Sequence, residues 1–438
     1  MMKFSHLGRN QTWQITKLPP GKRAIGCKWV FRLKLKDDGT IDRHKTRLVA
    51  KGYTQVEGVD YVESFSPVAK TVTVRLLLAV AAAQDWVIHQ LDVNNAFLHG
   101  KLDEEIFMTP PEGYQVADGC VCRLTRSLYG LKQASRQWNQ EFTSRLVSFD
   151  FTQCCHDHCL FTKGSGNNFL GLLVYVDDVL VVSPSLALVT SVKVYLDGLF
   201  TIKDLGVARY SLGLQIARSA DGLSLTQTKY IHDILVDTGL SSAKSVTTPL
   251  PQGVKLCSES GSLLADPEPY HRLIGRLLYL GFTRSDISYG VQQLIQFLLH
   301  PCDRHWAAAL HLVRYLKGTA QTGLFFPSAS SLDVRAFCDA DWGSCPDTRR
   351  SIFSKDQLAD LFTKNLLGPL FASLLSKMDL FSLSPGPSCG GSDEIVALVL
   401  IRMVIFQSEE SDGCEDDDAD SVLIAEYVAD ISFHVDAG

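Results

Sequence analysis

Apolar residues recur with two different periods in this chain, one typical of strands and one of helices. Residues 24–35 (AIGCKWVFRLKL) are rich in β-forming residues, alternate in part, and are followed by KDDGT and then IDRHKTRLVAKGY. We expect a hairpin here with Asp-Asp-Gly at its turn. Residues 168–182 (NFLGLLVYVDDVLVV) predict a second hairpin, because two apolar runs flank an Asp-Asp pair.

Other segments predict helices. Residues 74–86 are apolar on nearly every side and indicate a buried helix, followed by a strand in HQLDVNNAFLHG. Further helices are expected at residues 135–149, 189–200, 230–240, 270–282, 286–300 and 304–317. Gly318 stands where a helix-capping glycine belongs. The pattern supports an α+β chain with an antiparallel hairpin and a helical region after residue 268.

Charge is distributed unevenly along the 438 residues. The formal net charge is −6, from 42 Lys+Arg against 48 Asp+Glu. Residues 391–438 alone carry 13 acidic side chains and 1 basic one, whereas residues 1–50 carry 12 basic and 3 acidic. The acidic tail makes the net charge of the whole chain negative although the N-terminal region is basic. A basic region is compatible with a nucleic-acid partner.

Nothing in the sequence predicts a membrane protein. The longest apolar run, residues 395–406, is too short to span a bilayer and contains Arg402. The N-terminus has no secretory signal, and the 12 cysteines follow no disulfide framework. These features favour a reducing, intracellular location, and leave cytoplasm and nucleus open.

Carboxylates interrupt two of the apolar strands. Asp92 lies in QLDVNNAF, and Asp177 and Asp178 lie at the tip of the YVDD hairpin. A carboxylate in an apolar strand is costly unless it is paired or binds a cation. If the three converge, they could hold two Mg²⁺ ions and support in-line phosphoryl transfer. By itself, however, the Asp-Asp pair is also compatible with an ordinary acidic turn.

The surrounding segments resemble the reverse transcriptase of copia-type LTR retrotransposons, from Trp13 to Phe326. The resemblance is carried by ten blocks in the family's order. They are KWVFRLK, HKTRLVAKGYTQ, SFSPVAKTVTVRLLLA, QLDVNNAFLHG, SLYGLKQASRQWN, LLVYVDDVLV, DLGVARYSLGLQI, LTQTKYIHDIL, YHRLIGRLLYL and HLVRYLKGT.

This resemblance implies a right-hand polymerase fold with fingers, an antiparallel palm sheet and a thumb. It implies fingers at residues 1–90, a palm with the YVDD hairpin at 91–216, a helical thumb or connection at 217–326, an incomplete RNase H-like segment at 327–380 and an unrelated acidic tail at 381–438.

The resemblance also assigns roles to residues. Asp92 and Asp177 would be the principal metal ligands, with Asp178 completing the triad. Phe97 would exclude a ribose 2′-OH, although a phenylalanine at a strand end can equally be a core residue. The remaining substrate or template contacts would be Arg47, Lys34, Tyr129, Gly130, Lys132 and Gln133. The placement of Lys34 is loose, and a solvated basic face is an equal alternative.

A second active site is incomplete in the sequence. Asp339, in AFCDADWGSCPDTRR, and Asp360, in KDQLADLFTK, match the two ends of the family's RNase H domain. Only residues 351–354 separate the matching pieces, so the two intervening carboxylates are missing. We expect RNase H activity to be lost.

The resemblance implies an RNA-directed DNA polymerase that adds dNTPs to a primer 3′-OH on an RNA or DNA template. Two Mg²⁺ ions, with Mn²⁺ as a possible substitute, would be its cofactors. The alternative is an inactive retrotransposon remnant with at most non-specific nucleic-acid binding. The oligomeric state is left open by the sequence.

Overall fold

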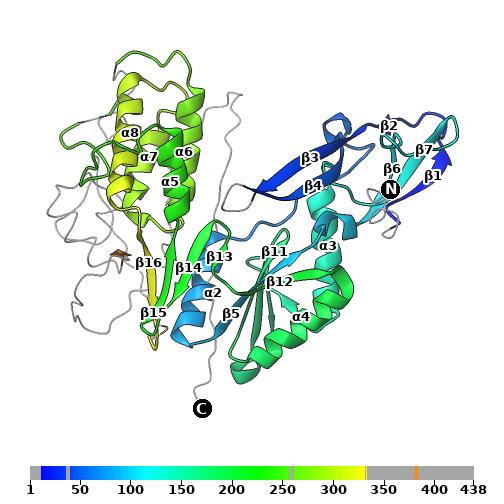
Figure 1. Cartoon of the computed structure of the whole chain (residues 1–438), viewed down its shortest axis with the longest axis horizontal. Coiled ribbons are helices and arrows are strands. Elements are labelled where there is room, and N and C mark those ends of the chain that lie inside the picture. The colour runs from blue at the N-terminus through cyan, green and yellow to red at the C-terminus, as the bar shows by residue number, and fades with distance from the viewer. Residues whose placement is uncertain are drawn as a thin grey trace, which may run out of the picture. The chain divides into compact units, whose positions relative to one another are not determined.

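The structure, a computed structural model, describes residues 11–35, 40–254, 256–257, 261–330, 332 and 380–382. The chain divides into two compact units (Figure 1). The first comprises Met1–Leu77 and Trp86–Leu212, and the second comprises Leu78–Asp85 and Gly213–Gly438. The predicted division into fingers, palm, thumb and further segments stays a prediction.

The largest sheet of the first unit has six strands in the order β12-β5-β11-β10-β9-β8. These strands are β5 (Val87–Val93), β8 (Thr152–Gln153), β9 (Leu160–Lys163), β10 (Leu170–Tyr175), β11 (Asp178–Ser183) and β12 (Ile202–Val207). Strands β10 and β11 form the predicted second hairpin, with Tyr175 opposite Asp178. The hairpin forms because its two apolar runs both enter the core.

Two helices cover one face of this sheet (Figure 1). They are α3 (Ala134–Val147) and α4 (Leu186–Phe200). Side chains alternate between the faces of a strand, so Leu91 and Val93 of β5 join Trp138 of α3 in the buried core. Asp92, between them in sequence, must therefore lie on the opposite face.

A second core lies under a smaller sheet of the first unit, with strand order β1-β7-β6-β2. Its strands are β1 (Trp13–Lys17), β2 (Ala24–Ile25), β6 (Lys101–Met108) and β7 (Cys120–Arg126). The first predicted hairpin is the antiparallel ribbon of β3 (Cys27–Leu35) and β4 (Ile41–Ala50). Its expected Asp-Asp-Gly turn lies outside the described residues. Short elements complete this unit: η2 (Gly52–Thr54), η3 (Ala96–His99), η4 (Gly166–Asn168) and β13 (Tyr210–Ser211).

The second unit combines a helical core with a sheet. Strands β14 (Leu214–Arg218), β15 (Gly222–Thr226), β16 (Thr322–Pro327) and β17 (Leu380–Ser382) follow one another in the sheet. The helices are α5 (Thr228–Asp237), α6 (Glu268–Leu280), η5 (Ser285–Ile287), α7 (Ser288–Ile295) and α8 (Asp303–Gly318). The C-terminal part of α2 (Thr71–Ala83) also belongs to this unit. Of the described helices, none is both long enough and apolar enough to span a bilayer.

A buried ion pair lies within the helical core of the second unit. Arg284 and Asp286 are 0% and 1% exposed. The guanidinium donates to Asp286 from Nε at 2.9 Å and from Nη2 at 2.6 Å, and the Tyr315 hydroxyl donates to the same carboxylate at 2.7 Å. Arg284 also donates to the carbonyl oxygen of Thr319 at 2.9 Å. Every charge in this network is therefore compensated.

The predicted helices are confirmed, with shifts of a few residues at their ends, except that the one expected at residues 286–300 is shorter: the turn η5 precedes α7, which already ends at Ile295. Gly318 is a correction: it is the last residue of α8 and not the cap, which is Thr319. The sequence patterns missed several strands, among them β1, β7, β12 and β16, whose short or mixed stretches become strands only by pairing with partners distant in sequence. The sequence VRAFCD at residues 334–339 also favours a strand, but these residues lie outside the described part of the chain.

Candidate active site

Two of the predicted carboxylates face each other across neighbouring strands. Asp92 of β5 is the direct partner of Asp178 of β11 in an antiparallel ladder. Side chains of directly opposed residues share a face and have Cβ atoms about 5 Å apart. Asp177 precedes Asp178 in the hairpin turn, and its carbonyl oxygen accepts a 2.8 Å hydrogen bond from the amide of Val93. The structure thus brings all three residues to one corner of the sheet.

The electrostatics of this corner are unfavourable for the bare protein. Burial raises the pKa of Asp178, Gln90 opposes the rise through a 3.3 Å hydrogen bond from its amide, and the charges of Asp177 and Asp92 raise the pKa further. Across the described ranges, no ion pair or hydrogen bond engages the side-chain carboxylates of Asp92 and Asp177. Like charges so arranged favour the binding of a cation.

The donor set fits a hard divalent cation, because carboxylate oxygens are the protein ligands that Mg²⁺ prefers. The three carboxylates do not form a closed ligand shell, however. Within the described part of the chain, no three His, Cys, Asp or Glu side chains are grouped closely enough to hold a metal ion alone. This suits Mg²⁺, which is usually held by one or two carboxylates, with water and substrate phosphates supplying the remaining ligands.

An arginine, a tyrosine and a phenylalanine form a second group in the same unit. The Arg47 guanidinium lies 4.9 Å from the ring centre of Tyr129, and Phe97 packs edge-on against the same ring at 5.2 Å. Burial raises the pKa of Tyr129, Arg47 lowers it, and Asp177 and Asp92 raise it again. The Tyr129 hydroxyl is therefore influenced by the charge of Arg47 and by the charges of the acidic corner, and it is protonated at neutral pH.

Close backbone packing fixes this group. The amide of Ala50 donates to the carbonyl oxygen of Tyr129 at 2.8 Å. Gly130 has φ +90°, and a Cβ atom there would lie 2.2 Å from the carbonyl oxygen of Ala50. Only glycine fits where the two backbones approach so closely.

Arg47 presents an unused donor. Its Nε atom is buried and has no hydrogen-bond partner within the described residues. Phe97 is half-buried and packs against both cores of the first unit. Its role as a core residue is therefore real, whereas a role in sugar selection stays a prediction.

Three predicted contact residues are placed differently. Lys34 pairs with Arg43, four positions along the ribbon from the Val30–Arg47 pair, and is exposed. The structure therefore does not bring Lys34 beside Arg47. The Lys132 ammonium donates to the Tyr61 hydroxyl at 3.1 Å.

Gln133 is fully buried. Its amide donates to the carbonyl oxygen of Asp60 and accepts from Gln55, both at 3.1 Å. Its amide is thus occupied within the protein, which favours a role in positioning the loop of residues 55–60 over direct contact with a substrate.

One neighbour of the carboxylates was not predicted. Lys203 of β12 is the direct partner of Asp92 on the side away from β11, and it is exposed. It follows that Asp92 has an acidic neighbour on one side and a basic one on the other. The sequence offered no signal for this pairing, because β12 itself was not recognised.

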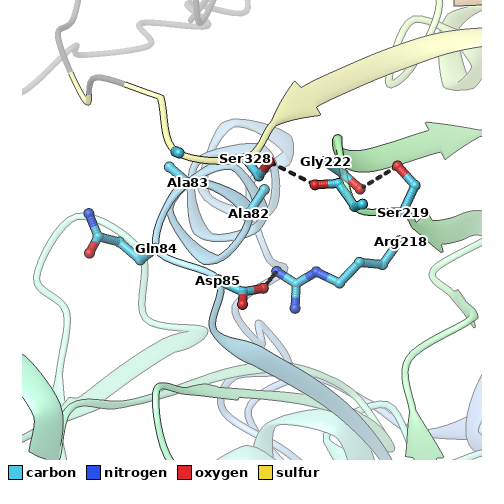
Figure 2. Close-up of a pocket in the computed structure, with 10 residues that line it drawn as sticks. Ala82, Ala83, Gln84, Asp85, Arg218, Ser219, Gly222 and Ser328 are labelled. Atoms are coloured by element: carbon cyan, nitrogen blue, oxygen red, sulfur yellow. Dashed lines mark hydrogen bonds and ion pairs between the residues drawn. The ribbon is translucent and has the colours of Figure 1, made fainter.

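The predicted second site cannot be placed, since Asp339 and Asp360 lie outside the described residues. A pocket does occur in the second unit, at the end of α2 (Figure 2). There Arg218 donates to the carbonyl oxygen of Ala81 at 2.8 Å and lies 3.9 Å from Asp85. None of the predicted site residues lines this pocket.

Residues 10–252, which include the acidic corner and the arginine–tyrosine group, match the family described as reverse transcriptase (RNA-dependent DNA polymerase). This stretch is more than half of the chain, and the chain therefore belongs to that family.

Similar proteins indicate which group of reverse transcriptases the chain resembles. The chain is 41% identical over 341 residues to the Retrovirus-related Pol polyprotein from transposon RE2 of Arabidopsis thaliana. It is 41% identical over 361 residues to the Retrovirus-related Pol polyprotein from transposon TNT 1-94 of Nicotiana tabacum. The matches cover 77% and 80% of this chain, but only 23% and 27% of the relatives. The predicted resemblance to copia-type Pol polyproteins is confirmed, and the chain spans about a quarter of their length.

Solved structures give a weaker similarity. A foamy viral protease-reverse transcriptase in complex with dsDNA is 14% identical, with a TM-score of 0.38 over 69% of this chain and 54% of that chain. This similarity is too low to support an inference about the present fold.

Proposed function

We propose that this chain is the RNA-directed DNA polymerase part of a copia-type Pol polyprotein, with the reaction centred on Asp92, Asp177 and Asp178. The observation that carries the proposal is the pairing of Asp92 with Asp178, beside Asp177, with no ion pair from any described residue to neutralise Asp92 or Asp177. A structural carboxylate cluster would be expected to have such partners.

The substrates are a dNTP and the 3′-OH of a primer on an RNA or DNA template. Asp92 and Asp177 would hold Mg²⁺, or Mn²⁺ in its place, with Asp178 beside them. When bound, the ions supply the positive charge that activates the attacking oxygen and stabilises the leaving pyrophosphate. The positive charge of Arg47, which acts on Tyr129 together with the charges of Asp177 and Asp92, supports a role in binding the triphosphate.

Phe97 and Tyr129 have a complementary role. Their edge-on packing at 5.2 Å would form a wall for the deoxyribose and leave no space for a 2′-OH. Gly130 and Lys132 would line the same substrate pocket, and the basic ribbon of β3 and β4, including Lys34, would contact phosphates of the nucleic acid.

The fold that we infer for the chain is the right-hand polymerase fold. Fingers and palm would lie in the first unit and a thumb or connection in the second, followed by an RNase H segment that has lost its activity. An inactive remnant is the less favoured alternative, because every residue of the polymerase triad is present.

The test is primer extension on poly(rA)·oligo(dT) with Mg²⁺ and dTTP, beside Asp177→Asn as control. We expect extension that the control abolishes. A folded chain without extension, or extension that survives in the control, would contradict the proposal.

A further inference from the structure

The tip of the YVDD hairpin has an unusual backbone conformation. Val176 and Asp177 form the two-residue turn between β10 and β11, and Val176 has φ +57°. Two-residue turns with a positive φ at their first position usually have glycine there. For a β-branched residue this conformation is strained, because Cβ crowds the following carbonyl oxygen. Some contact outside the hairpin must hold it.

A tryptophan from α3 supplies that contact. The indole Nε1–H of Trp138 donates a 2.6 Å hydrogen bond to the carbonyl oxygen of Val176. This oxygen belongs to the peptide group that joins Val176 to Asp177. Fixing the plane of that peptide group fixes ψ of Val176 and φ of Asp177, and hence the direction in which the Asp177 side chain leaves the backbone.

Trp138 is itself held rigidly. It is 2% exposed and packs against Phe142 and Phe200, with ring centres 5.0 Å and 5.1 Å away. Gly100 lets the first turns of α3 approach closely, since a Cβ there would lie 2.8 Å from the backbone nitrogen of Trp138. A donor mounted in this way has little freedom to move.

We propose that Trp138 is a positioning residue that holds Val176 in its left-handed conformation and so sets the placement of Asp177 and Asp178. The inference rests on the proposed function for its effect on catalysis. The structural part, the restraint of the hairpin, can be measured without any activity.

The sharpest variant replaces Trp138 with 3-benzothienylalanine, which keeps the shape of the ring but has sulfur in place of the N–H donor. Trp138→Phe is the encodable version. The matched control is Trp86→Phe, since Trp86 stacks on Phe169 with ring centres 4.7 Å apart elsewhere in the same unit.

Loss of the donor should lower kcat for primer extension by about tenfold or more, because misplacement of catalytic groups by about 1 Å costs up to about 10²-fold. The dNTP KM should change by less than about threefold, because Arg47 and Tyr129 are untouched. The half-saturating Mg²⁺ concentration should rise. Trp86→Phe should change none of these values.

Hydrogen exchange gives the readout that does not depend on activity. The amide of Val93 donates to the carbonyl oxygen of Asp177, and Asp178 pairs with Tyr175. The amides of Val93 and Asp178 should exchange faster in the benzothienyl and phenylalanine variants than in wild type. The other amides of β5 should exchange at the wild-type rate. Equal exchange and equal kcat in wild type and the benzothienyl variant would overturn the proposal.

Val176→Gly provides the coupling test. Glycine adopts a positive φ without strain, so the hairpin should depend less on Trp138. The exchange effect of Trp138→Phe should therefore be smaller in the Val176→Gly background than in wild type. Equal effects in both backgrounds would reduce Trp138 to a packing residue. An inactive wild type would refute the proposed function but leave the exchange result to decide this inference.

Discussion

The two units of this protein surround an acidic side chain in opposite ways, and the one in the second unit is fully buried whereas the one in the first is half-buried. In the second unit, Asp286 receives two hydrogen bonds from Arg284 and one from Tyr315. In the first unit, Asp178 receives a 3.3 Å hydrogen bond from Gln90, with Asp177 next to it in sequence and Asp92 opposite it on β5. The carboxylate of Asp286 is neutralised within the protein, whereas no ion pair from a described residue neutralises the negative charges around Asp178. This difference is why we propose the first group, and not the second, as a cation site.

The largest expected effect comes from removing a carboxylate at the uncompensated corner. Asp177→Asn should lower the rate of primer extension by about 10³-fold or more, since the charge that holds the catalytic cation is lost. Thermal stability should be unchanged or slightly higher, because repulsion among the three carboxylates is relieved. Calorimetry beside the extension assay checks both. A large loss of stability would mean that this corner is structural after all.

Breaking the compensated pair should damage stability instead. Arg284→Ala leaves Asp286 buried without its cation, and should lower the free energy of unfolding by about 3–5 kcal/mol. Urea denaturation measures the effect. The double variant Arg284→Met with Asp286→Leu should recover most of the loss, because it removes both buried charges. A loss below about 1 kcal/mol for the single variant would refute the comparison.

The contributions of Arg47 and Lys34 to dNTP binding can be measured separately from that of the carboxylates. Arg47→Ala should raise the dNTP KM by about 30-fold with a smaller change in kcat, since a charge-assisted hydrogen bond of about 2 kcal/mol is removed. Lys34→Ala should raise it by only a few-fold, because Lys34 lies four positions further along the ribbon. Steady-state extension at varied dTTP measures both. Equal effects of the two variants would place Lys34 at the triphosphate.

The smallest effect is a pH dependence confined to the second unit. His305 is fully buried, its Nδ1 accepts a 3.0 Å hydrogen bond from the amide of Cys302, and its Nε2 bonds the carbonyl oxygen of Cys257 at 3.1 Å. Burial lowers the pKa of His305 below its ordinary value of 6.5. The unfolded chain therefore takes up the proton first, and the stability contributed by the neutral ring is lost as the pH falls below 6.5 through the folded pKa.

We expect about 1 kcal/mol of destabilisation from this residue between pH 7.5 and 5.5. Urea midpoints of wild type and His305→Gln at the two pH values test it. His311, whose pKa burial also lowers, is retained in the variant, so part of the dependence should persist. An unchanged dependence in His305→Gln would exclude His305 as its source.

The sequence by itself determined most of the local elements and singled out the acidic residues that we propose for the reaction. The hairpin of residues 168–182 was predictable because two apolar runs around a turn can pair only with each other at that distance. Asp92, Asp177 and Asp178 stood out because charge in an apolar strand is costly. Gly130 was predicted as a substrate or template contact; the structure shows it packed against the backbone of Ala50, and the contact with substrate stays a prediction.

Only the tertiary structure decided which of these residues meet. Asp92 faces Asp178 because β5 lies between β12 and β11, and this order depends on pairings between distant segments. The same packing buries Gln133, separates Lys34 from Arg47, brings Lys203 beside Asp92 and places the Trp138 indole against Val176. Side-chain periodicity specifies which face of an element is buried, but long-range register is set by the core that several elements build together.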